Sequence, residues 1–223
     1  MSRKADVAPE YASQRPRGAV LDGHPWRRFA VLGDSVVEQP GGFADIVRDE
    51  LAAAARGLEH RNLGRRNLRA AEVLAVQLSP ALAFAPDLAL VVCGANDAMR
   101  PGYEARAGEV DAAMAAIVRP LQAAGACVIT VSVFVMREYP RMPAWLGAGF
   151  ARRMACLAER TNALAAALGT VHVDLSEHPA IARGDVLTGE DGLHGNVHSH
   201  RIAAAAVLER LAALRWAAPP GGK

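Results

Sequence analysis

Short apolar runs alternate along the chain with longer stretches whose apolar residues recur at helical spacing. Runs of this kind are typical of strands that a parallel sheet buries on both faces. We predict strands at residues 28–32, 59–63, 87–93, 127–133 and 171–175. The run at 87–93, Asp-Leu-Ala-Leu-Val-Val-Cys, is the clearest of them.

The stretches between the strands have helical periodicity. We expect helices at residues 43–56, 68–82, 104–124, 150–168, 176–183 and 197–214. Residues 134–149 hold two prolines and two glycines among large side chains and are expected to form a loop.

Strands that alternate with long helices predict an α/β fold, with a parallel sheet between two layers of helices. No internal repeat or linker divides the chain, so we expect one domain at residues 26–215. Residues 1–25 mix charge, Pro and Gly and are expected to be a disordered tail, with a frayed end at 216–223.

Composition and charge narrow the class of protein. Hydrophobic residues make up 52% of the chain, and a formal net charge of +2 does not favour nucleic acid or a membrane surface as a partner. No apolar run approaches the roughly 18 residues of a membrane span, and the N-terminus lacks a signal peptide's apolar core. Three cysteines without paired spacing indicate a reducing compartment. We therefore expect a cytoplasmic protein without stable membrane association, and the Ala- and Arg-rich composition suggests a bacterial source.

Polar clusters follow the first three predicted strands and precede the last helix. Because the ends of parallel strands share one edge of a sheet, these clusters can converge. An acyl-transfer site needs a nucleophile, a base, a group that orients the base and an oxyanion donor. Ser35, His194, Asp191 and Asn96 offer these functions in that order. Taken singly, Ser35 also reads as a helix N-cap and His194 as a histidine at a helix start.

Three of the clusters together resemble a known family. Gly33-Asp34-Ser35, Gly94-Ala95-Asn96-Asp97 and Asp191-Gly192-Leu193-His194 are similar to blocks I, III and V of the SGNH/GDSL hydrolases, in the same order. The resemblance implies a flavodoxin-like three-layer α/β/α fold with a five-stranded parallel sheet, and hydrolysis of esters or thioesters. It also implies a triad of Ser35, Asp191 and His194, without a metal or organic cofactor.

The resemblance also implies an oxyanion hole, and here the sequence departs from the family. Its donors would be the backbone N–H of Ser35, the side chain of Asn96 and a glycine N–H five residues after an asparagine. Asn62 matches that asparagine, but the residue five positions later is Asn67. Asn tolerates the left-handed conformation better than most residues, so Asn67 is the first choice for this donor. Gly64, in the same turn, is the second.

A metal site is the alternative interpretation of the histidines near the last helix. His194 and His198 have a ligand-like spacing, but no Glu accompanies them as in a zinc protease helix. His198 and His200 lie on different helix faces. We therefore predict no metal.

Large side chains in the loop at 134–149 suggest a lid or an acyl pocket. We expect Tyr139, Met142 and Trp145 to line the substrate pocket; a loop packed back on the core is an equally ordinary interpretation. Arginines near the same edge fit an anionic substrate or, as we prefer, a solvated rim. They are Arg65, Arg66, Arg69, Arg100, Arg137 and Arg141.

The sequence thus favours a serine esterase that acts on a small-molecule ester through an acyl-enzyme, as a monomer or small homo-oligomer. Two alternatives stay open. Acyl transfer to a small alcohol or amine would use the same residues and differ only in the exclusion of water. A catalytically silent binding domain would have kept the fold while the oxyanion turn diverged.

Overall fold

The computed structural model describes residues 21, 23–55, 57–136, 139, 141–185 and 188–214, with only the backbone at Ala144 and Trp145. All of the predicted C-terminal tail, 216–223, and most of the N-terminal one, 1–25, lie outside these residues. At the N-terminal end of the described part, Leu21 and His24 are buried. His24 Nε2 lies 3.0 Å from the carbonyl oxygen of Leu51 in helix α2 (Phe43–Ala54). The packed domain therefore begins before residue 26, earlier than the sequence predicts.

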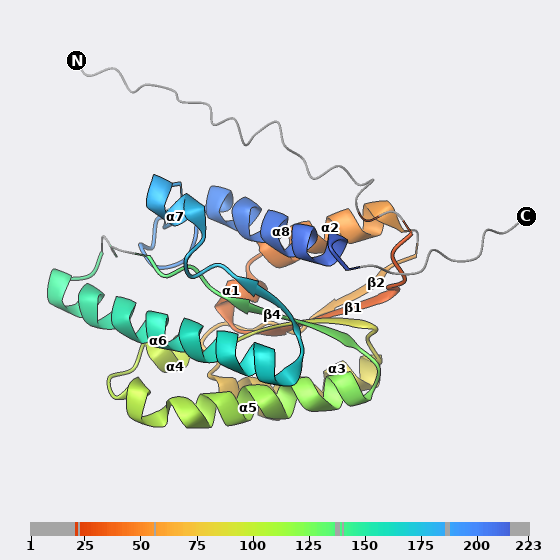
Figure 1. Cartoon of the computed structure of the whole chain (residues 1–223), viewed down its shortest axis with the longest axis horizontal. Coiled ribbons are helices and arrows are strands. Elements are labelled where there is room, and N and C mark those ends of the chain that lie inside the picture. Colours follow the sequence, from red (N-terminus) through yellow and green to blue (C-terminus); the bar gives the residue numbers. More distant parts are fainter. Residues whose placement is uncertain are drawn as a thin grey trace, which may run out of the picture.

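Five parallel strands form the sheet, as predicted. They are β1 (Arg28–Gly33), β2 (Glu59–Asn62), β3 (Leu88–Val92), β4 (Cys127–Ser132) and β5 (Val171–Asp174), in the order β2-β1-β3-β4-β5 (Figure 1). The chain runs outward from β1 to β2 and then returns to β3 on the other side of β1. Such a reversal leaves a crevice at the carboxyl ends of the strands, where α/β proteins bind ligands.

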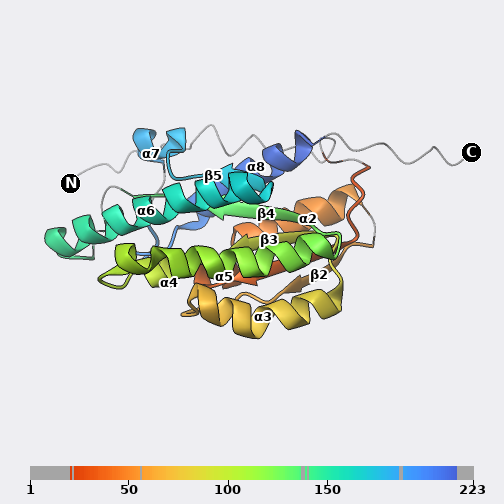
Figure 2. The same cartoon turned by 60° about the horizontal axis from the view of Figure 1, so that its bottom comes forward.

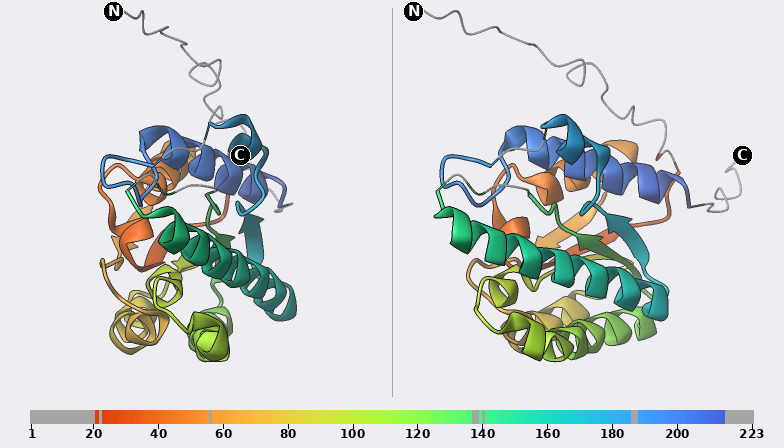
Figure 3. Two further views of the ribbon diagram at one scale, coloured as in Figure 1. Left: turned by 90° about the vertical axis from the view of Figure 1, so that its left-hand side faces the viewer. Right: turned by 60° about the vertical axis from the view of Figure 1, so that its left-hand side comes forward.

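Helices cover both faces of the sheet, which confirms the predicted three-layer α/β/α fold. Helices α2 and α8 (Val197–Ala212) cover one face. The other face carries α3 (Ala70–Phe84), α5 (Tyr103–Ala123) and α6 (Ala144–Leu168), which come forward in Figure 2. The end-on view in Figure 3 shows the layers. Among the described residues, none of the helices is long and apolar enough to cross a membrane.

The strand side chains alternate between two apolar clusters, one on each face of the sheet. Leu32 and Val91 belong to the cluster beneath α3, α5 and α6, whereas Val31 and Leu90 belong to the cluster beneath α2 and α8. All four side chains are fully buried. Burial on both faces explains why the central strands read as continuous apolar runs rather than alternating ones.

The segment 134–149 differs from its predicted loop. Helix α6 begins at Ala144, directly after Pro143, and so takes in Gly147 and Gly149. Pro143 stands at the N-cap of this helix, which runs on through the two glycines despite their weak helix propensity. Gly147 is buried, and an added Cβ would lie 3.9 Å from the Cβ atoms of both Tyr139 and Met142. The prediction of a loop was therefore wrong for the second half of this segment.

Candidate active site

Ser35 stands at the carboxyl end of β1, in a turn that only glycine permits. A Cβ on Gly33 would lie 2.0 Å from the carbonyl oxygen of Val92, so a side chain there would separate β1 from β3. Asp34 then caps helix α1 (Ser35–Glu38), because its Oδ1 accepts a hydrogen bond of 3.0 Å from the Val36 N–H. The turn leaves Ser35 half-buried at the first position of that helix.

Gln77 of α3 fixes the same turn. Its Oε1 accepts from the Gly33 N–H and its Nε2 donates to the Gly33 carbonyl oxygen, both at 2.8 Å. The side chain is 2% exposed, so both bonds lie out of water, where they are strongest. Sequence reasoning missed Gln77; the available signal was an amide flanked by Val76 and Leu78 in an apolar helix.

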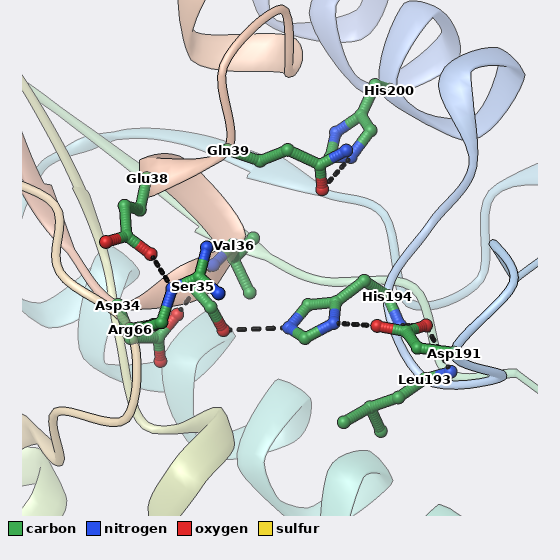
Figure 4. Close-up of polar contacts among 10 residues, drawn as sticks. All are labelled: Asp34, Ser35, Val36, Glu38, Gln39, Arg66, Asp191, Leu193, His194 and His200. Atoms are coloured by element: carbon green, nitrogen blue, oxygen red, sulfur yellow. Dashed lines mark hydrogen bonds and ion pairs between the residues drawn. The ribbon is translucent and has the colours of Figure 1, made fainter.

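His194 and Asp191 come from the loop before α8, and the structure brings them to Ser35 (Figure 4). His194 Nε2 lies 2.9 Å from Ser35 Oγ, and His194 Nδ1 lies 2.5 Å from Asp191 Oδ2. The other carboxylate oxygen, Oδ1, accepts from the backbone N–H groups of Leu193 and His194, at 2.9 and 3.0 Å. These bonds orient the carboxylate and the loop that carries the imidazole.

The charge on Asp191 decides which nitrogen of His194 carries a proton. Burial disfavours the charged carboxylate, but hydrogen bonds from the His194 ring and from the Leu193 and His194 N–H groups outweigh it and lower the pKa of Asp191 to about 2. An ionised carboxylate only accepts hydrogen bonds, so His194 Nδ1 must be the donor. In the neutral ring Nε2 is then free to accept the Ser35 hydroxyl proton.

Three N–H donors line the same cavity as Ser35 Oγ. Asn67 has a left-handed backbone, with φ of 67°. Among the described residues, the backbone N–H groups of Ser35 and Asn67 have no hydrogen-bond acceptor. Asn96 of helix α4 (Ala95–Ala98) donates Nδ2 to the carbonyl oxygen of Leu68 at 3.0 Å, which uses one of its two amide hydrogens.

Gly64, the second choice for an oxyanion donor, has its N–H occupied. It donates to Asn62 Oδ1 at 2.8 Å, while Asn62 Nδ2 donates to the carbonyl oxygen of Val37 at 2.7 Å. A Cβ on Gly64 would lie 2.8 Å from Val37 Cγ2. The glycine therefore allows close packing of this turn against α1.

Asp34 is an additional buried carboxyl beside the nucleophile. It is fully buried, and its Oδ2 has no partner in the described part of the chain. Burial raises the pKa of Asp34 to about 7, although the hydrogen bond from the Val36 N–H and the nearby His194 oppose the shift. The carboxyl therefore titrates near neutral pH.

Asp34→Asn is expected to stabilise the protein more at pH 8 than at pH 5. Because the folded-state pKa lies above the unfolded value, the folded state retains this proton between about pH 4 and pH 7, and stability falls as the pH rises through that window. In the wild-type protein this ionisation lowers the free energy of unfolding by up to about 4 kcal/mol above pH 7. Asparagine keeps the cap and carries no charge, so the variant does not lose this stability. Urea unfolding of both proteins at the two pH values measures the difference. An equal difference at both would contradict the prediction.

A cavity of about 480 Å³ opens at the triad. Tyr139 lines it, whereas Met142 is absent from its lining and packs on the core cluster beneath α6. The side chain of Trp145 lies outside the described part. Met99, Met136 and Met154 also line the cavity. Sequence reasoning missed them because methionines in helices and loops carry no signal for a shared wall.

His200 and Arg66 have structural partners at the cavity wall. His200 Nδ1 accepts from the Phe43 N–H at 3.3 Å, and its Nε2 lies 3.1 Å from Gln39 Oε1. Arg66 donates Nε to Glu38 at 2.8 Å, on the rim of the cavity. No group of His, Cys, Asp and Glu side chains that could hold a metal ion occurs among the described residues. His200 and Arg66 thus join neighbouring segments of the cavity wall.

A protein-family model and several solved structures match the chain. The model of the GDSL-like lipase/acylhydrolase family matches residues 31–202, which include Ser35, Asn67, Asn96, Asp191 and His194. The chain belongs to this family. Membership makes it an ester-hydrolysing enzyme and confirms the resemblance seen in the sequence. No curated protein sequence matches the chain significantly.

Solved structures show the same fold at low identity. Axe2, an acetylxylan esterase from Geobacillus stearothermophilus, is 17% identical with a TM-score of 0.63, over 85% of this chain and 95% of that one. LAE5, an α/β hydrolase enzyme from the metagenome of Lake Arreo in Spain, is 17% identical with a TM-score of 0.65, over 85% and 97%. At such identity the likeness concerns the fold.

Proposed function

We propose that this family member hydrolyses a carboxylic ester of a small molecule through an acyl-enzyme on Ser35. The observation that carries the proposal is the continuous hydrogen-bonded line from Ser35 Oγ through His194 to Asp191, with distances of 2.9 and 2.5 Å. A nucleophile, a base and a group that orients the base in this geometry form a serine hydrolase triad.

In the first half-reaction Ser35 Oγ attacks the ester carbonyl carbon while His194 Nε2 takes the hydroxyl proton. Asp191 stabilises the imidazolium that forms. The tetrahedral intermediate then expels the alcohol, which receives the proton from His194, and the acyl group stays on Ser35. In the second half-reaction His194 deprotonates a water molecule that attacks the acyl-enzyme, so the acid leaves and Ser35 regains its proton.

The oxyanion of both intermediates would be held by the N–H groups of Ser35 and Asn67 and by Asn96 Nδ2. The unused backbone donors and the remaining amide hydrogen of Asn96 support this assignment. Gly64 is the weaker candidate because its N–H already donates to Asn62. Donors that are fixed before the reaction stabilise the developing charge without reorganisation.

A fluorophosphonate probe tests the nucleophile. We expect it to label Ser35 of the wild-type protein and to abolish hydrolysis of p-nitrophenyl acetate in proportion to labelling. Ser35→Ala should neither be labelled nor turn over the ester. Absence of labelling in wild-type protein whose circular dichroism shows it folded would overturn the proposal in favour of a silent binding domain.

Asn67→Gly is expected to keep kcat/KM within about threefold of wild type. Glycine retains the N–H and adopts a positive φ without strain, and the exposed Asn67 side chain has no hydrogen bond among the described residues. Asn67→Val should lower kcat about tenfold or more, because a β-branched residue is strained at positive φ by roughly 1–2 kcal/mol and the turn would shift. Initial rates on p-nitrophenyl acetate compare the three proteins. Equal kcat for the Val variant would contradict the role of this turn.

A further inference from the structure

The loop that carries Asp191 and His194 is closed on itself. The Gly189 N–H donates to the carbonyl oxygen of His194 at 2.7 Å, and the Gly192 N–H donates to the carbonyl oxygen of Gly189 at 3.0 Å. Figure 4 shows the His194 ring between the Asp191 carboxylate of the same loop and Ser35. The backbone bonds are internal to the loop, so they do not by themselves hold it against the segment that carries Ser35.

Gly192, at the tip of this loop, lies against the side-chain stem of Arg141. A Cβ on Gly192 would lie 2.7 Å from Arg141 Cγ, 2.9 Å from its Cβ and 3.1 Å from its Cδ, and these are the three nearest atoms outside the adjoining residues. The backbone of Gly192 has a φ of 70°, which glycine adopts without strain. Because position 192 has no side chain, the stem of Arg141 lies directly on the backbone between Asp191 and Leu193.

The residues around Arg141 are anchored to the core. The Met142 N–H donates to the carbonyl oxygen of Tyr139 at 2.8 Å. The ring of Tyr139 packs on that of Phe150 with centroids 4.6 Å apart, and both side chains are buried. Met142 packs on the core cluster beneath α6. The backbone that carries Arg141 is therefore fixed, and its stem is a firm surface for the loop.

The contact is made by the carbon atoms of the stem and does not need the charge. Arg141 is exposed, and arginine commonly lays its stem on a neighbour while the guanidinium stays in water. The described residues that line the cavity do not include Arg141. Burial opposes the low pKa of Asp191, and hydrogen bonds from His194 and Leu193 produce it. An uncharged side chain with a similar stem should therefore replace Arg141.

We propose that Arg141 is a positioning residue: its stem, packed on Gly192, holds the loop so that His194 Nε2 stays within hydrogen-bond distance of Ser35 Oγ. The inference rests on the proposed function, because it gives Arg141 a task in that reaction. A loop without this contact would move away from Ser35 for part of the time. A misplacement of about 1 Å is enough to slow a reaction by about 10²-fold.

Variants at position 141 separate the stem from the charge. Arg141→Ala should lower kcat for p-nitrophenyl acetate by about ten- to a hundredfold and change KM by less than about twofold, because His194 acts in the transition state. Arg141→Met keeps a stem without the charge and should keep kcat within about threefold of wild type. Arg119→Ala, at an exposed position of α5, is the matched control and should keep wild-type kcat. Wild-type kcat in Arg141→Ala, or equal losses in the Ala and Met variants, would overturn the inference.

A double-mutant cycle tests the contact itself. Gly192→Ala should lower kcat about tenfold or more, because its Cβ meets the Arg141 stem and its backbone is strained at positive φ. In the Arg141→Ala background the methyl group has room, so the same substitution should cost several-fold less. Residues in contact show such non-additive effects. An equal cost in both backgrounds would show that the two positions are not coupled and would contradict the inference.

The ¹⁵N chemical shift of His194 Nε2 measures the positioning without turnover. In the wild-type protein this nitrogen accepts a hydrogen bond from Ser35 Oγ, and Ser35→Ala gives the shift without that bond. In Arg141→Ala the shift should move toward the Ser35→Ala value, whereas in Arg141→Met it should stay at the wild-type value. An unchanged shift in Arg141→Ala would overturn the role of Arg141 alone. Failure of the fluorophosphonate probe to label folded wild-type protein would instead overturn the proposed function.

Discussion

Replacing His194 with alanine is expected to lower kcat for p-nitrophenyl acetate by about 10⁴–10⁶-fold, the loss typical of removing the base of a serine triad. Ser35 Oγ has one base within hydrogen-bond distance in the described part of the chain, the Nε2 atom of His194 at 2.9 Å. Without His194 no side chain that the structure describes accepts the Ser35 hydroxyl proton as Oγ attacks the ester carbonyl carbon. Because nucleophile and base act as a unit, Ser35→Ala/His194→Ala should be hardly slower than either single variant.

His178→Ala is the matched control for this experiment. His178 caps α7 (Pro179–Arg183), where its Nδ1 accepts from the Ala180 N–H at 3.2 Å, outside the residues that line the cavity. The control should lose some stability and keep wild-type kcat. Full turnover by His194→Ala, or equal losses in the two variants, would show that another group is the base.

Asn96→Ala is expected to lower kcat by about 10²–10³-fold with little change in KM, as expected for one oxyanion donor that acts only when charge develops. Asn96 has one amide hydrogen on the Leu68 carbonyl oxygen and a second for the substrate. The variant removes both interactions, and the bond to Leu68 ties α4 to the segment that contains Asn67. Steady-state kinetics separates kcat from KM and thereby the transition-state contribution from a change in binding.

Gln122→Ala is the matched control for Asn96→Ala, because it removes the same type of hydrogen bond away from the site. Gln122 Nε2 donates to the Leu168 carbonyl oxygen at 2.9 Å, the same type of bond as that between Asn96 and Leu68. Both variants leave a backbone carbonyl without its donor and should lose comparable stability in urea unfolding. Only Asn96→Ala should lose turnover. A loss confined to KM would instead assign Asn96 to substrate binding.

The residue order was sufficient to predict the sheet and the three-layer fold. Strands buried on both faces, such as β3, leave a pattern of consecutive apolar residues that a short stretch reveals by itself. Helix boundaries were less certain. Helix α6 starts at Ala144, after Pro143 at its N-cap, and runs through Gly147 and Gly149 despite their weak helix propensity. Gly147 is buried there beside Tyr139 and Met142, which local sequence does not reveal.

The candidate site, too, could be predicted from the sequence only in part. Three motifs known from one family pointed to Ser35, Asn96, Asp191 and His194, because the catalytic geometry of such a family constrains residue types at fixed places in the sequence. The clamp by Gln77 on Gly33 had no such signal, since an amide 44 residues away becomes a partner only when α3 packs on β1.

The sequence by itself determined which strands form, which residues are the candidates for the chemistry, and that the turn after β2 departs from the family pattern at Asn67. Only the tertiary structure decided that Gly64 has its N–H occupied, that Asn67 takes a φ of 67°, and which side chains line the cavity at Ser35. The physical reason is the range of the interactions. Burial patterns and helix caps act between residues close in sequence, whereas the cavity wall joins residues from Ser35 to Ala203 that meet only when the sheet and its two helix layers have assembled.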